Sequence, residues 1–556
     1  MEKIKSQLVI FILIILLAQF VAKSQISTNE LPISFSYVSE VFQTNERMLK
    51  TMSQIDLETL SLEDKIDEKL GIPPRFGYPH EVDFTLENSG IWFDLPNGDK
   101  LWKLEIYCPG ALSINLLYDK FWLPEGAKFF VYSSDKKHHI GAFTSNNNFG
   151  SKEELRGFAT GLIYGERIVL EYYLPNEVLE QGVISVSHIV QGYRYINVFN
   201  NFDDNKKKGD AFQAGFKQSD TCHININCPA GQNWQKEKRA IAMIIVGIGN
   251  RWCTGSLINT TANDMRPYFL TADHCLFSNG SKADALYNPL LDHWSFYWHY
   301  ESPGCISPLT DPINVNLSTV GATVIANALN DSLTDFALLR LSDDPIHKKG
   351  VRPYYLGWDR RPVPEFTNGV GIHHPNGDVK KISNSFQIFN YSQTIHWSNG
   401  AVSIPYTHWR ADFNSGSMQG GSSGSPLLNN KGNIIGQVHG GAPVTCNTNY
   451  YAYYGRLSVS WVGRMNQFYR LSHHLDPIGF GSTTIEVLNG KNYCNETTIS
   501  RVISQNEYVK CDNIIITNTR VMAGRKLTVE TLNLNIGTDF VVEEGAEFEV
   551  IIFNTP

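Results

Sequence analysis

A short stretch rich in glycine and serine, "GGSSGSP" at residues 420–426, has the composition of a turn that presents a nucleophile. Gly421 and Gly424 allow a tight turn whose backbone N–H groups converge on one point, where they can stabilise an oxyanion. A flexible linker is the alternative, but linkers do not normally run straight into strand, turn and strand sequence such as "PLLNNKGNIIGQVHGG". We therefore predict that Ser423 is a catalytic nucleophile.

A serine hydroxyl needs a base and a group that orients this base, and the chain offers both. His274 follows a β-type run in "RPYFLTADHCLF", next to Cys275, and is the predicted general base. Asp335 precedes an apolar run in "DSLTDFALLRLSD", where burial would require hydrogen-bond partners such as an imidazole N–H. The chain order His, Asp, Ser differs from the Ser, Asp, His order of α/β-hydrolases.

The elements that must position these residues are mainly strands. Within residues 217–478, strand-like runs such as "AIAMIIVGIG", "WSFYWHY" and "FALLRL" dominate. Helix-period stretches are few before "VGRMNQFYRLSHHL", which lies near the end of this block. The pattern predicts an all-β barrel or sandwich that is closed by a helix.

Two further regions rich in β-type sequence flank this central block. Residues 25–200 alternate aromatic and β-branched runs with turns, which predicts a β-sandwich-like domain. The charged and polar segment 201–216 is typical of an exposed linker, where the chain is easily cut. Residues 485–556 contain two similar units with a glycine before an alternating run, which favours a small β-repeat domain or, equally well, a β-meander.

Composition and the N-terminus indicate an exported protein. A formal net charge of -8 over 556 residues gives no basic footprint for nucleic acid. Residues 1–24 combine lysines, an apolar stretch and small residues at a cleavage position, which predicts a signal peptide; an N-terminal membrane anchor is the alternative. We expect a secreted or cell-surface protein with no membrane span after signal removal.

The 9 cysteines fit an oxidising compartment. Six of them lie in the central block and indicate three disulfides without specifying the pairing. Cys494 and Cys511 lie together near the C-terminus, whereas Cys108 stands alone in the N-terminal third. The absence of a CxxC pair disfavours a zinc ribbon. We assign no metal role to the adjacent His373 and His374, which we interpret as ordinary polar residues of a loop.

The central block resembles serine endopeptidases of the chymotrypsin fold, and specifically the secreted bacterial lysyl endopeptidases. Nine separated segments have counterparts in the same order in that family: "CHININCPAG", "CTGSLINTTAND", "YFLTADHC", "TDFALLRL", "GWDRR", "IHHPNGDVKKISNS", "GGSSGSP", "GQVHGG" and "YYGRLSVSW". The resemblance implies an all-β protein with a chymotrypsin-like double β-barrel of two six-stranded barrels, and the active site between them. The N-terminal β-sandwich-like region resembles the pro-region of that family.

The resemblance also assigns roles to individual residues. It carries over His274 as the base, Asp335 as the residue that orients it and Ser423 as the nucleophile. The oxyanion donors would be the N–H groups of Gly421 and Ser423. A tryptophan and a histidine near the triad of the family look like Trp397 and His439, although Trp409 lies close to the first of them. The disulfides that the resemblance implies are Cys222–Cys446, Cys228–Cys305 and Cys253–Cys275.

The sequence departs from its relatives where they carry acids. The position aligned with the pocket carboxylate of lysyl endopeptidases is Ala452, and the pocket position of trypsin-like relatives is Ser417. We therefore expect a neutral specificity pocket, with Ser417, His439 and Ala452, and no strict preference for lysine. Ser422 stands where trypsin-type zymogens have the Asp that receives a new N-terminus, so that ion pair cannot form. Activation by removal of the N-terminal domain, with a mature chain that starts close to Lys217, is the prediction.

The sequence thus predicts a secreted serine endopeptidase, made as a zymogen, that cuts proteins or peptides through an acyl-enzyme. It needs no cofactor and no metal, and we expect it to be a monomer. Two alternatives stay open: a binding or adhesion protein with an inactive protease-like domain, and an esterase or other acyl transferase with the same chemistry.

Overall fold

A computed structural model gives the structure of the chain. It describes residues 30–37, 48–194 and 216–552, apart from 279–280, 283–288, 315–316, 329–332, 349, 363–366, 442–445, 447–449, 464–469, 480, 490–495, 505–506, 512 and 532. The predicted signal peptide and nearly all of the predicted linker 201–216 lie outside the described residues. Within the described ranges, no helix has the length and apolar character needed to cross a membrane.

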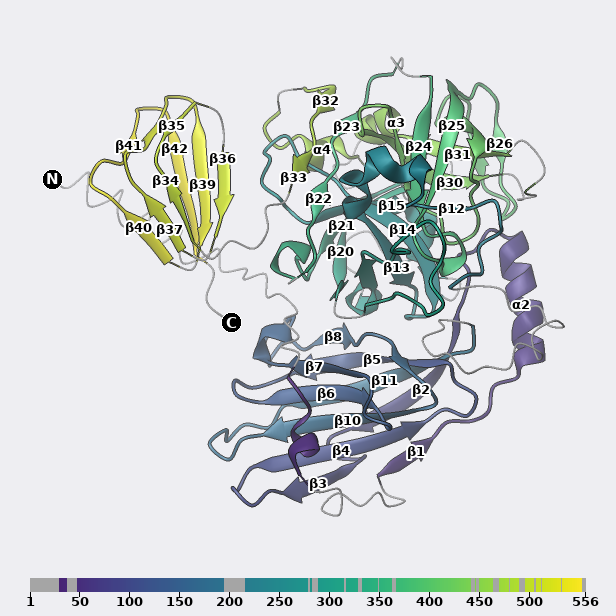
Figure 1. The fold of residues 1–556 in the computed structure, drawn as a ribbon, viewed down its shortest axis with the longest axis vertical. Coiled ribbons are helices and arrows are strands. Elements are labelled where there is room, and N and C mark those ends of the chain that lie inside the picture. Colours follow the sequence, from purple (N-terminus) through teal and green to yellow (C-terminus); the bar gives the residue numbers. More distant parts are fainter. Residues whose placement is uncertain are drawn as a thin grey trace. The chain divides into compact units, whose positions relative to one another are not determined.

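Two sheets form the N-terminal region (Figure 1). The first contains β1 (Leu49–Thr51), β3 (Ile91–Asp94), β4 (Lys100–Tyr107), β6 (Lys128–Ser133), β7 (His139–Phe143) and β10 (Arg167–Leu174). The second contains β2 (Gly77–Thr85), β5 (Ser113–Trp122), β8 (Arg156–Ala159), β9 (Ile163–Tyr164) and β11 (Val183–Gly192). Leu104 and Leu170 of the first sheet share one buried apolar cluster with Leu116 and Val190 of the second. Two sheets with a common core form a sandwich.

One helix of this region, α2 (Leu57–Lys69), is absent from the sequence prediction, which assigned only strands to residues 25–200. Its signal is a local one: the carboxylate of Asp56 accepts hydrogen bonds from the backbone N–H groups of Glu58 and Thr59. Most of its residues are exposed or half-buried, and only Leu60 and Asp64 are buried. The apolar face is therefore too narrow to show a helical period clearly.

The first sheet of the central block has 7 strands in the order β19-β18-β13-β14-β15-β21-β20. Their bounds are β13 (Ile241–Val246), β14 (Arg251–Leu257), β15 (Tyr268–Ala272), β18 (Ser295–Trp298), β19 (Ser318–Val320), β20 (Ala322–Asn327) and β21 (Phe336–Leu341). All residues of β13, β15 and β18 are buried, because their sequences are continuous apolar or aromatic runs. This sheet carries the predicted base and its orienting carboxylate.

The second sheet of the central block has 9 strands. They are β12 (Ile224–Asn225), β23 (Trp358–Asp359), β24 (Gly369–His373), β25 (Lys381–Asn390), β28 (His408–Ser415), β29 (Pro426–Leu428), β30 (Ile434–Gly441), β31 (Tyr450–Arg456) and β32 (Thr484–Ile485). Because β29 pairs with both β24 and β30, the strands β24, β25, β28, β31, β30 and β29 close into a barrel. The prediction of an all-β protein with a β-barrel in the central block is confirmed; six strands close this barrel, and the first sheet has 7.

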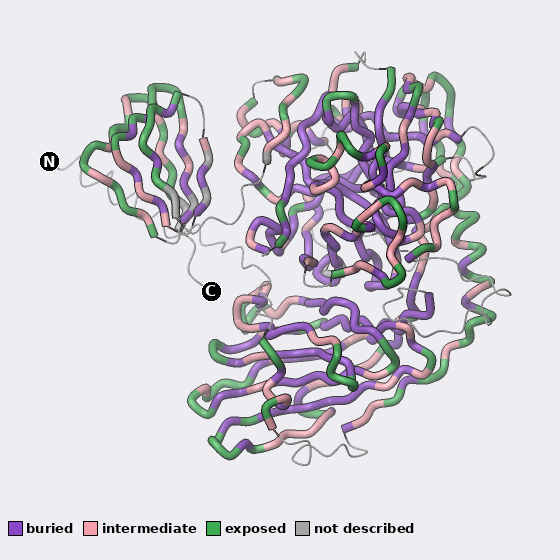
Figure 2. The backbone as a smooth tube through the Cα atoms, in the orientation of Figure 1, coloured by how far each residue is buried: buried purple, intermediate pink, exposed green. Residues whose placement is uncertain are grey.

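Short elements complete the central block. They are the strand pairs β16 (Phe277–Ser278) with β17 (Ser281–Lys282), β22 (Tyr354–Tyr355) with β33 (Leu488–Asn489), and β26 (Ile395–His396) with β27 (Val402–Ser403), and the helices α3 (Leu457–Val462) and α4 (Ser472–Leu475). In the stretch "VGRMNQFYRLSHHL", for which a helix is expected, α3 ends at Val462, Gly463 lies outside the helix, and Ser472–Leu475 form α4; residues 464–469 lie outside the described residues. Figure 2 shows that buried backbone follows the strands of both central sheets, whereas exposed backbone lies mainly in the connections.

Three disulfides cross-link the central block: Cys222–Cys446, Cys228–Cys305 and Cys253–Cys275. They are the pairs that the resemblance implies. Cys511 is also disulfide-bonded. Cys108 is a buried free thiol whose pKa is raised to about 12 by burial, so that it stays protonated and inert in the core.

Residues 494–552 form a separate unit. Its nine strands make three parallel sheets: β34 (Glu496–Ile499), β37 (Asn513–Ile516) and β40 (Asn533–Ile536); β35 (Val502–Ile503), β38 (Arg520–Val521) and β41 (Val541–Val542); and β36 (Glu507–Lys510), β39 (Lys526–Thr531) and β42 (Glu547–Ile552). Matching residues of successive repeats lie side by side, for example Ile499, Ile516 and Ile536. Because a meander has antiparallel pairs, this parallel register identifies a stack of repeats.

The N-terminal sandwich contacts the central block through buried polar groups. Arg156 forms an ion pair with the buried carboxylate of Asp292. The Nε2 of His293 lies 2.9 Å from the carbonyl oxygen of Tyr118. Burial lowers the pKa of His293 to about 4, so that its imidazole is neutral at pH 7 and donates Nε2–H to this carbonyl.

The pKa of His293 predicts an acid-dependent loss of stability. Between pH 6.5 and about 4, the unfolded chain holds a proton on this imidazole that the folded chain does not, so stability falls as the pH falls. We expect His293→Gln, which keeps a donor for Tyr118, to reduce this slope by ~1.4 kcal/mol per pH unit. Urea unfolding at pH 4.5, 5.5 and 7 measures it; equal slopes in both proteins would contradict the assignment.

Candidate active site

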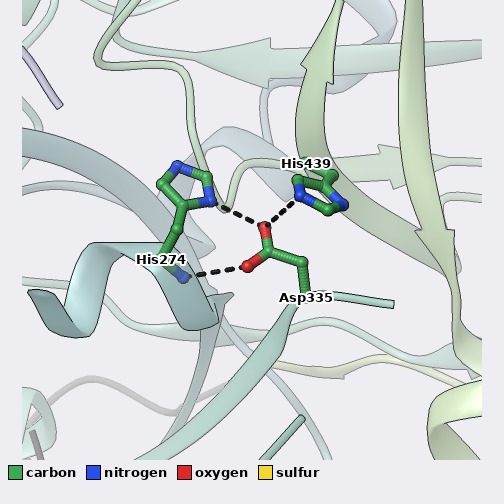
Figure 3. A group of neighbouring side chains, drawn as sticks. All are labelled: His274, Asp335 and His439. Atoms are coloured by element: carbon green, nitrogen blue, oxygen red, sulfur yellow. Dashed lines mark hydrogen bonds and ion pairs between the residues drawn. The ribbon is translucent and has the colours of Figure 1, made fainter. Parts of the chain in front are cut away.

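His274 and Asp335 form a doubly hydrogen-bonded pair (Figure 3). The Nδ1 of His274 lies 2.7 Å from Asp335 Oδ2, and the backbone N–H of His274 donates to Oδ1 at 2.8 Å. The side chain of Asp335 is fully buried, so its charge persists only with such partners. The carboxylate therefore fixes both the ring orientation and the tautomer of His274, with the proton on Nδ1.

Strand register brings these two residues together. Strand β15 pairs with β21 antiparallel, and its last residue, Ala272, lies opposite Phe336, the first residue of β21. The 3-10 turn that follows β15 carries His274, and Asp335 directly precedes β21. Asp335 has a φ of 55°, an uncommon conformation for a residue with a side chain, which costs about 1–3 kcal/mol. The surrounding hydrogen bonds stabilise this conformation, which aims the carboxylate at His274.

Ser423 lies on a turn between β28 and β29 whose shape depends on two glycines. Gly421 and Gly424 have φ values of 88° and 83°, which favour glycine. A Cβ at Gly424 would collide with Thr271 Oγ1, and one at Gly421 would lie 2.9 Å from the carbonyl oxygen of His374. The turn thus packs too closely for any larger residue at either position.

The turn offers the two donors that an oxyanion needs. The N–H groups of Ser422, Gly424 and Ser425 donate to carbonyl oxygens within the protein. Among the described residues, no acceptor is recorded for the N–H groups of Gly421 and Ser423. Ser423 itself is half-buried, whereas its neighbours Ser422 and Gly424 are buried. Alternating free donors beside a half-buried serine match the requirement for stabilising a tetrahedral intermediate.

A further set of side chains contacts the carboxylate of Asp335 from the other side (Figure 3). The Nε2 of His439 lies 3.8 Å from Asp335 Oδ2. The indole of Trp397 stacks on His439 at a centroid distance of 3.7 Å, and its Nε1–H donates to Ser403 Oγ. Trp409 instead packs in the core of the second barrel. The tryptophan beside the predicted site is thus Trp397.

Hydrogen bonds determine where the protons of this set lie. Thr407 Oγ1 donates to the carbonyl of Ile404, so it accepts from His408 Nδ1 at 2.9 Å. His408 Nε2, 2.9 Å from His439 Nδ1, must then accept the Nδ1 proton of His439. Burial lowers the pKa of His408 to about 3 and that of His439 well below its usual value, so both rings are neutral. The Nε2 of His439 that faces Asp335 is therefore unprotonated and donates no hydrogen bond. The carboxylate of Asp335 accepts hydrogen bonds from His274 instead.

His274, Asp335 and His439 also bring three potential metal ligands within 4.8 Å of one another. The 2.7 Å separation of His274 Nδ1 and Asp335 Oδ2 is that of a direct hydrogen bond. Two ligands of one zinc ion, each about 2.0–2.2 Å from it in a tetrahedral site, would lie more than 3 Å apart. We therefore assign this cluster to hydrogen bonding.

The predicted pocket residues Ala452 and Ser417 lie in the second sheet and in a connection between two of its strands. Ala452 is fully buried on β31, opposite Ala411 on one side and Gly441 on the other. Ser417 is buried in the connection between β28 and the nucleophile turn, where its carbonyl accepts a hydrogen bond from Ser383 Oγ. Neither position carries an acid.

The polar-loop interpretation of His373 and His374 is wrong, because both side chains are fully buried. His373 Nδ1 lies 2.8 Å from Ser422 Oγ, and His374 Nδ1 lies 3.0 Å from the carbonyl oxygen of Asp378. Burial lowers the pKa of both imidazoles well below the usual value, so they act as neutral hydrogen-bonding groups. Through its contact with Ser422, His373 thus helps to hold the turn that carries Ser423, a role that the sequence analysis missed.

The first residues of the central block bind beside the same turn. The backbone N–H of Lys217 donates to Asp378 Oδ1 at 2.8 Å, and Ser219 Oγ donates to Oδ2 at 2.5 Å. The N–H of Asp220 donates to Gln419 Oε1 at 3.0 Å. This segment therefore holds both the loop at Asp378 and the start of the turn that carries Ser423.

Two comparisons of the sequence with known proteins give similar results. Residues 216–455 match the family model described as "Lysyl endopeptidase, C-terminal domain". The chain is 27% identical to a lysyl endopeptidase of Pseudomonas aeruginosa over 373 residues, which cover 65% of this chain and 71% of that protein.

Solved structures with similar chains include a thermostable serine protease, AL20, from an extremophilic microorganism, at 14% identity and a TM-score of 0.28 over 40% of this chain and 92% of that one. A Glu endopeptidase in complex with MPD is similar at 18% identity and a TM-score of 0.25, over 39% and 86%. On the matched domain and the curated relative, the chain is a serine-type endopeptidase that resembles the lysyl endopeptidases.

Proposed function

We propose that the chain is a secreted serine endopeptidase that cuts peptide bonds with Ser423 as nucleophile, His274 as general base and Asp335 as the group that orients His274. The observation that carries the proposal is the buried His274–Asp335 pair, in which the carboxylate accepts from the backbone N–H and from Nδ1 of His274. The contact of Cys275 Sγ with the carbonyl of Ser423, at 3.9 Å, supports the placement of the nucleophile beside this imidazole.

The reaction follows from these positions. His274 Nε2 removes the proton of Ser423 as Oγ attacks the peptide carbonyl, and the N–H groups of Gly421 and Ser423 stabilise the resulting oxyanion. The imidazolium then protonates the leaving amine, which leaves an acyl-enzyme. Water activated by His274 cleaves the ester and restores the serine. Asp335 stays ionised throughout and stabilises the imidazolium.

Specificity is the point where we propose a difference from lysyl endopeptidases. A substrate lysine in a buried pocket needs a carboxylate partner, because an unpaired buried ammonium loses several kcal/mol of hydration. Ser417 and Ala452 provide none, and both are buried. We propose that the pocket accepts small or apolar side chains and has no strict preference for lysine.

Removal of the nucleophile is the direct test of the mechanism. We expect Ser423→Ala to lower cleavage of a mixed peptide library by at least about 10⁴-fold, read by mass spectrometry. Ser425→Ala is the matched control, because it removes a hydroxyl from the same turn that is buried without a partner among the described residues. Equal cleavage by Ser423→Ala and the native enzyme would contradict the role of Ser423, and no cleavage by either would favour a binding protein.

The same library tests the pocket. We expect the native enzyme to cut after several small or apolar residues, whereas Ser417→Asp should raise the preference for Lys over Leu by about tenfold or more, since it adds a counter-charge. Ser417→Asn, which has the same size without the charge, is the control. Cleavage by the native enzyme after lysine alone would contradict the neutral pocket.

Maturation by loss of the N-terminal region is part of the proposal. Cleavage before Lys217 would convert its amide N–H, which already bonds to the buried Asp378, into a charged ammonium beside a carboxylate. This contact supports a new chain end at Lys217. The acid beside that end would be Asp378, since the position used by trypsin-type zymogens holds Ser422. We expect N-terminal sequencing of secreted active enzyme to begin close to Lys217. A sequence that begins at Gln25 would contradict this maturation.

A further inference from the structure

The strand that holds the nucleophile turn also binds a segment of the N-terminal region. On β14, the N–H of Thr254 donates to the carbonyl of Ser423 at 2.9 Å. The N–H of Trp252, two residues earlier and therefore on the same edge of the strand, donates to the carbonyl of Pro74 at 3.0 Å. Two residues of a strand span ~7 Å. The backbone of Pro74 thus lies only about that far along the edge from the backbone of Ser423.

The segment that contains this residue, Pro73–Phe76, pairs with the edge of β14 like a short strand. The N–H of Phe76 donates to the carbonyl of Asn250 at 2.8 Å, and Arg75 forms an antiparallel bridge with Arg251. Pro74 is therefore the end nearer to Ser423, and the chain runs away from the nucleophile as residue numbers rise. The residues of a substrate that follow the scissile bond run in the same sense.

The position of His274 identifies which part of a substrate this edge would hold. His274 protonates the leaving amine, so the residues after the scissile bond must pass beside it. Its neighbour Cys275 is disulfide-bonded to Cys253 of β14, the residue between Trp252 and Thr254. The edge at residues 250–252 is thus next to the base, whereas Ala452 of the predicted pocket lies in the other sheet.

Side chains fasten the Pro73–Phe76 segment at this edge. Phe76 stacks on Trp252 at a centroid distance of 5.0 Å, and both rings are fully buried. A Cβ at Gly420, the first residue of the nucleophile turn, would lie 3.4 Å from Pro74 Cδ. Arg251 donates to the carbonyl of Pro73 at 2.7 Å and pairs with Asp67 of α2 at 2.6 Å.

We propose that the edge of β14 at residues 250–252, together with Gly420, is the binding site for the residues of a peptide substrate that follow the scissile bond, and that the Pro73–Phe76 segment occupies this site in the uncut chain as an internal competitor. The inference rests on the proposed function and adds to it a subsite and the segment that blocks it. Two prolines suit such a competitor, because their fixed φ keeps the segment extended before it binds.

An internal competitor has a distinct kinetic signature. The tether gives the Pro73–Phe76 segment an effective concentration in the millimolar range, so that it raises the KM of any substrate that needs the same edge. It does not change kcat, since substrate that has displaced it reacts normally. A reagent that reacts with the serine but has no residues after the reacting bond escapes the competition.

The test uses the full-length chain and two reagents. One is a quenched fluorescent peptide with four residues after a bond that the enzyme cuts. The other is a fluorophosphonate: Ser423 Oγ forms a bond to phosphorus, fluoride leaves, and His274 takes the proton. Asp67→Ala removes the ion pair with Arg251, and Pro74→Gly loosens the segment without touching the predicted triad. Glu180→Ala, which removes an ion pair with Lys152 inside the N-terminal region, is the matched control.

For Asp67→Ala and Pro74→Gly, we expect the KM for the peptide to fall about tenfold, while kcat and the rate of fluorophosphonate labelling stay within about twofold of the native values. Glu180→Ala should match the native chain in all three. Thermal unfolding confirms that each variant is folded. Normal labelling with an unchanged KM in both variants would overturn the internal competitor alone. No labelling in any protein would overturn the proposed function, and the inference with it.

Discussion

The close approach of the nucleophile turn to strands β14 and β15 is the constraint on which the rest of the site depends. The turn belongs to the second sheet of the central block, and the two strands belong to the first. Gly424 permits the contact, because any side chain there would collide with Thr271. The N–H and the hydroxyl of Thr254 then bind the carbonyls of Ser423 and Gly421. The backbone N–H and the side-chain hydroxyl of one residue of β14, Thr254, thus hold the turn of Ser423 against the first sheet.

The turn that carries Ser423 is held by hydrogen bonds between neutral side chains and the backbone, and not by ion pairs within the described part of the chain. Ser422 Oγ lies 2.8 Å from His373 Nδ1 and accepts the N–H of Gln419 at 3.3 Å. Burial keeps the pKa of His373 well below its usual value, so the contact involves no charge. A buried network of this kind stabilises one geometry only when its members are satisfied together. Ser422 stands where trypsin-type zymogens have the Asp that pairs with a new N-terminus. Its hydrogen bonds to His373 and Gln419 are already formed in the uncut chain.

Features that follow from local patterns, such as strands, could be predicted from the sequence. Features that depend on which residues are buried by distant parts of the chain could not. The strand character of β15 and β21 follows from their apolar runs, and the positions of His274 and Asp335 at the adjoining ends follow from antiparallel pairing. The parallel repeat stack of residues 494–552 was one of two equal alternatives, because two short units cannot fix register. His373 and His374 gave no signal of burial, since histidine is found both inside and outside proteins. The contact of Pro74 with Trp252 joins residues distant in sequence, and no periodicity reports such a pairing.

Two segments, one before and one after the predicted linker, contact the start of the turn that carries Ser423. Pro74 covers Gly420 from the side of β14, while the N–H of Asp220 binds the side chain of the adjacent Gln419. The first contact belongs to the N-terminal region and the second to the central block, so the predicted cut before Lys217 would lie between them in the sequence. On the proposed maturation, loss of the first segment would expose the edge of β14 and leave the hydrogen bonds of Thr254 to Ser423 and Gly421 in place. The second segment stays attached through Cys222–Cys446 and keeps Asp378 and Gln419 in place. The hydrogen bonds that Thr254, His373 and Asp220 make with the turn of Ser423 therefore all lie within the central block.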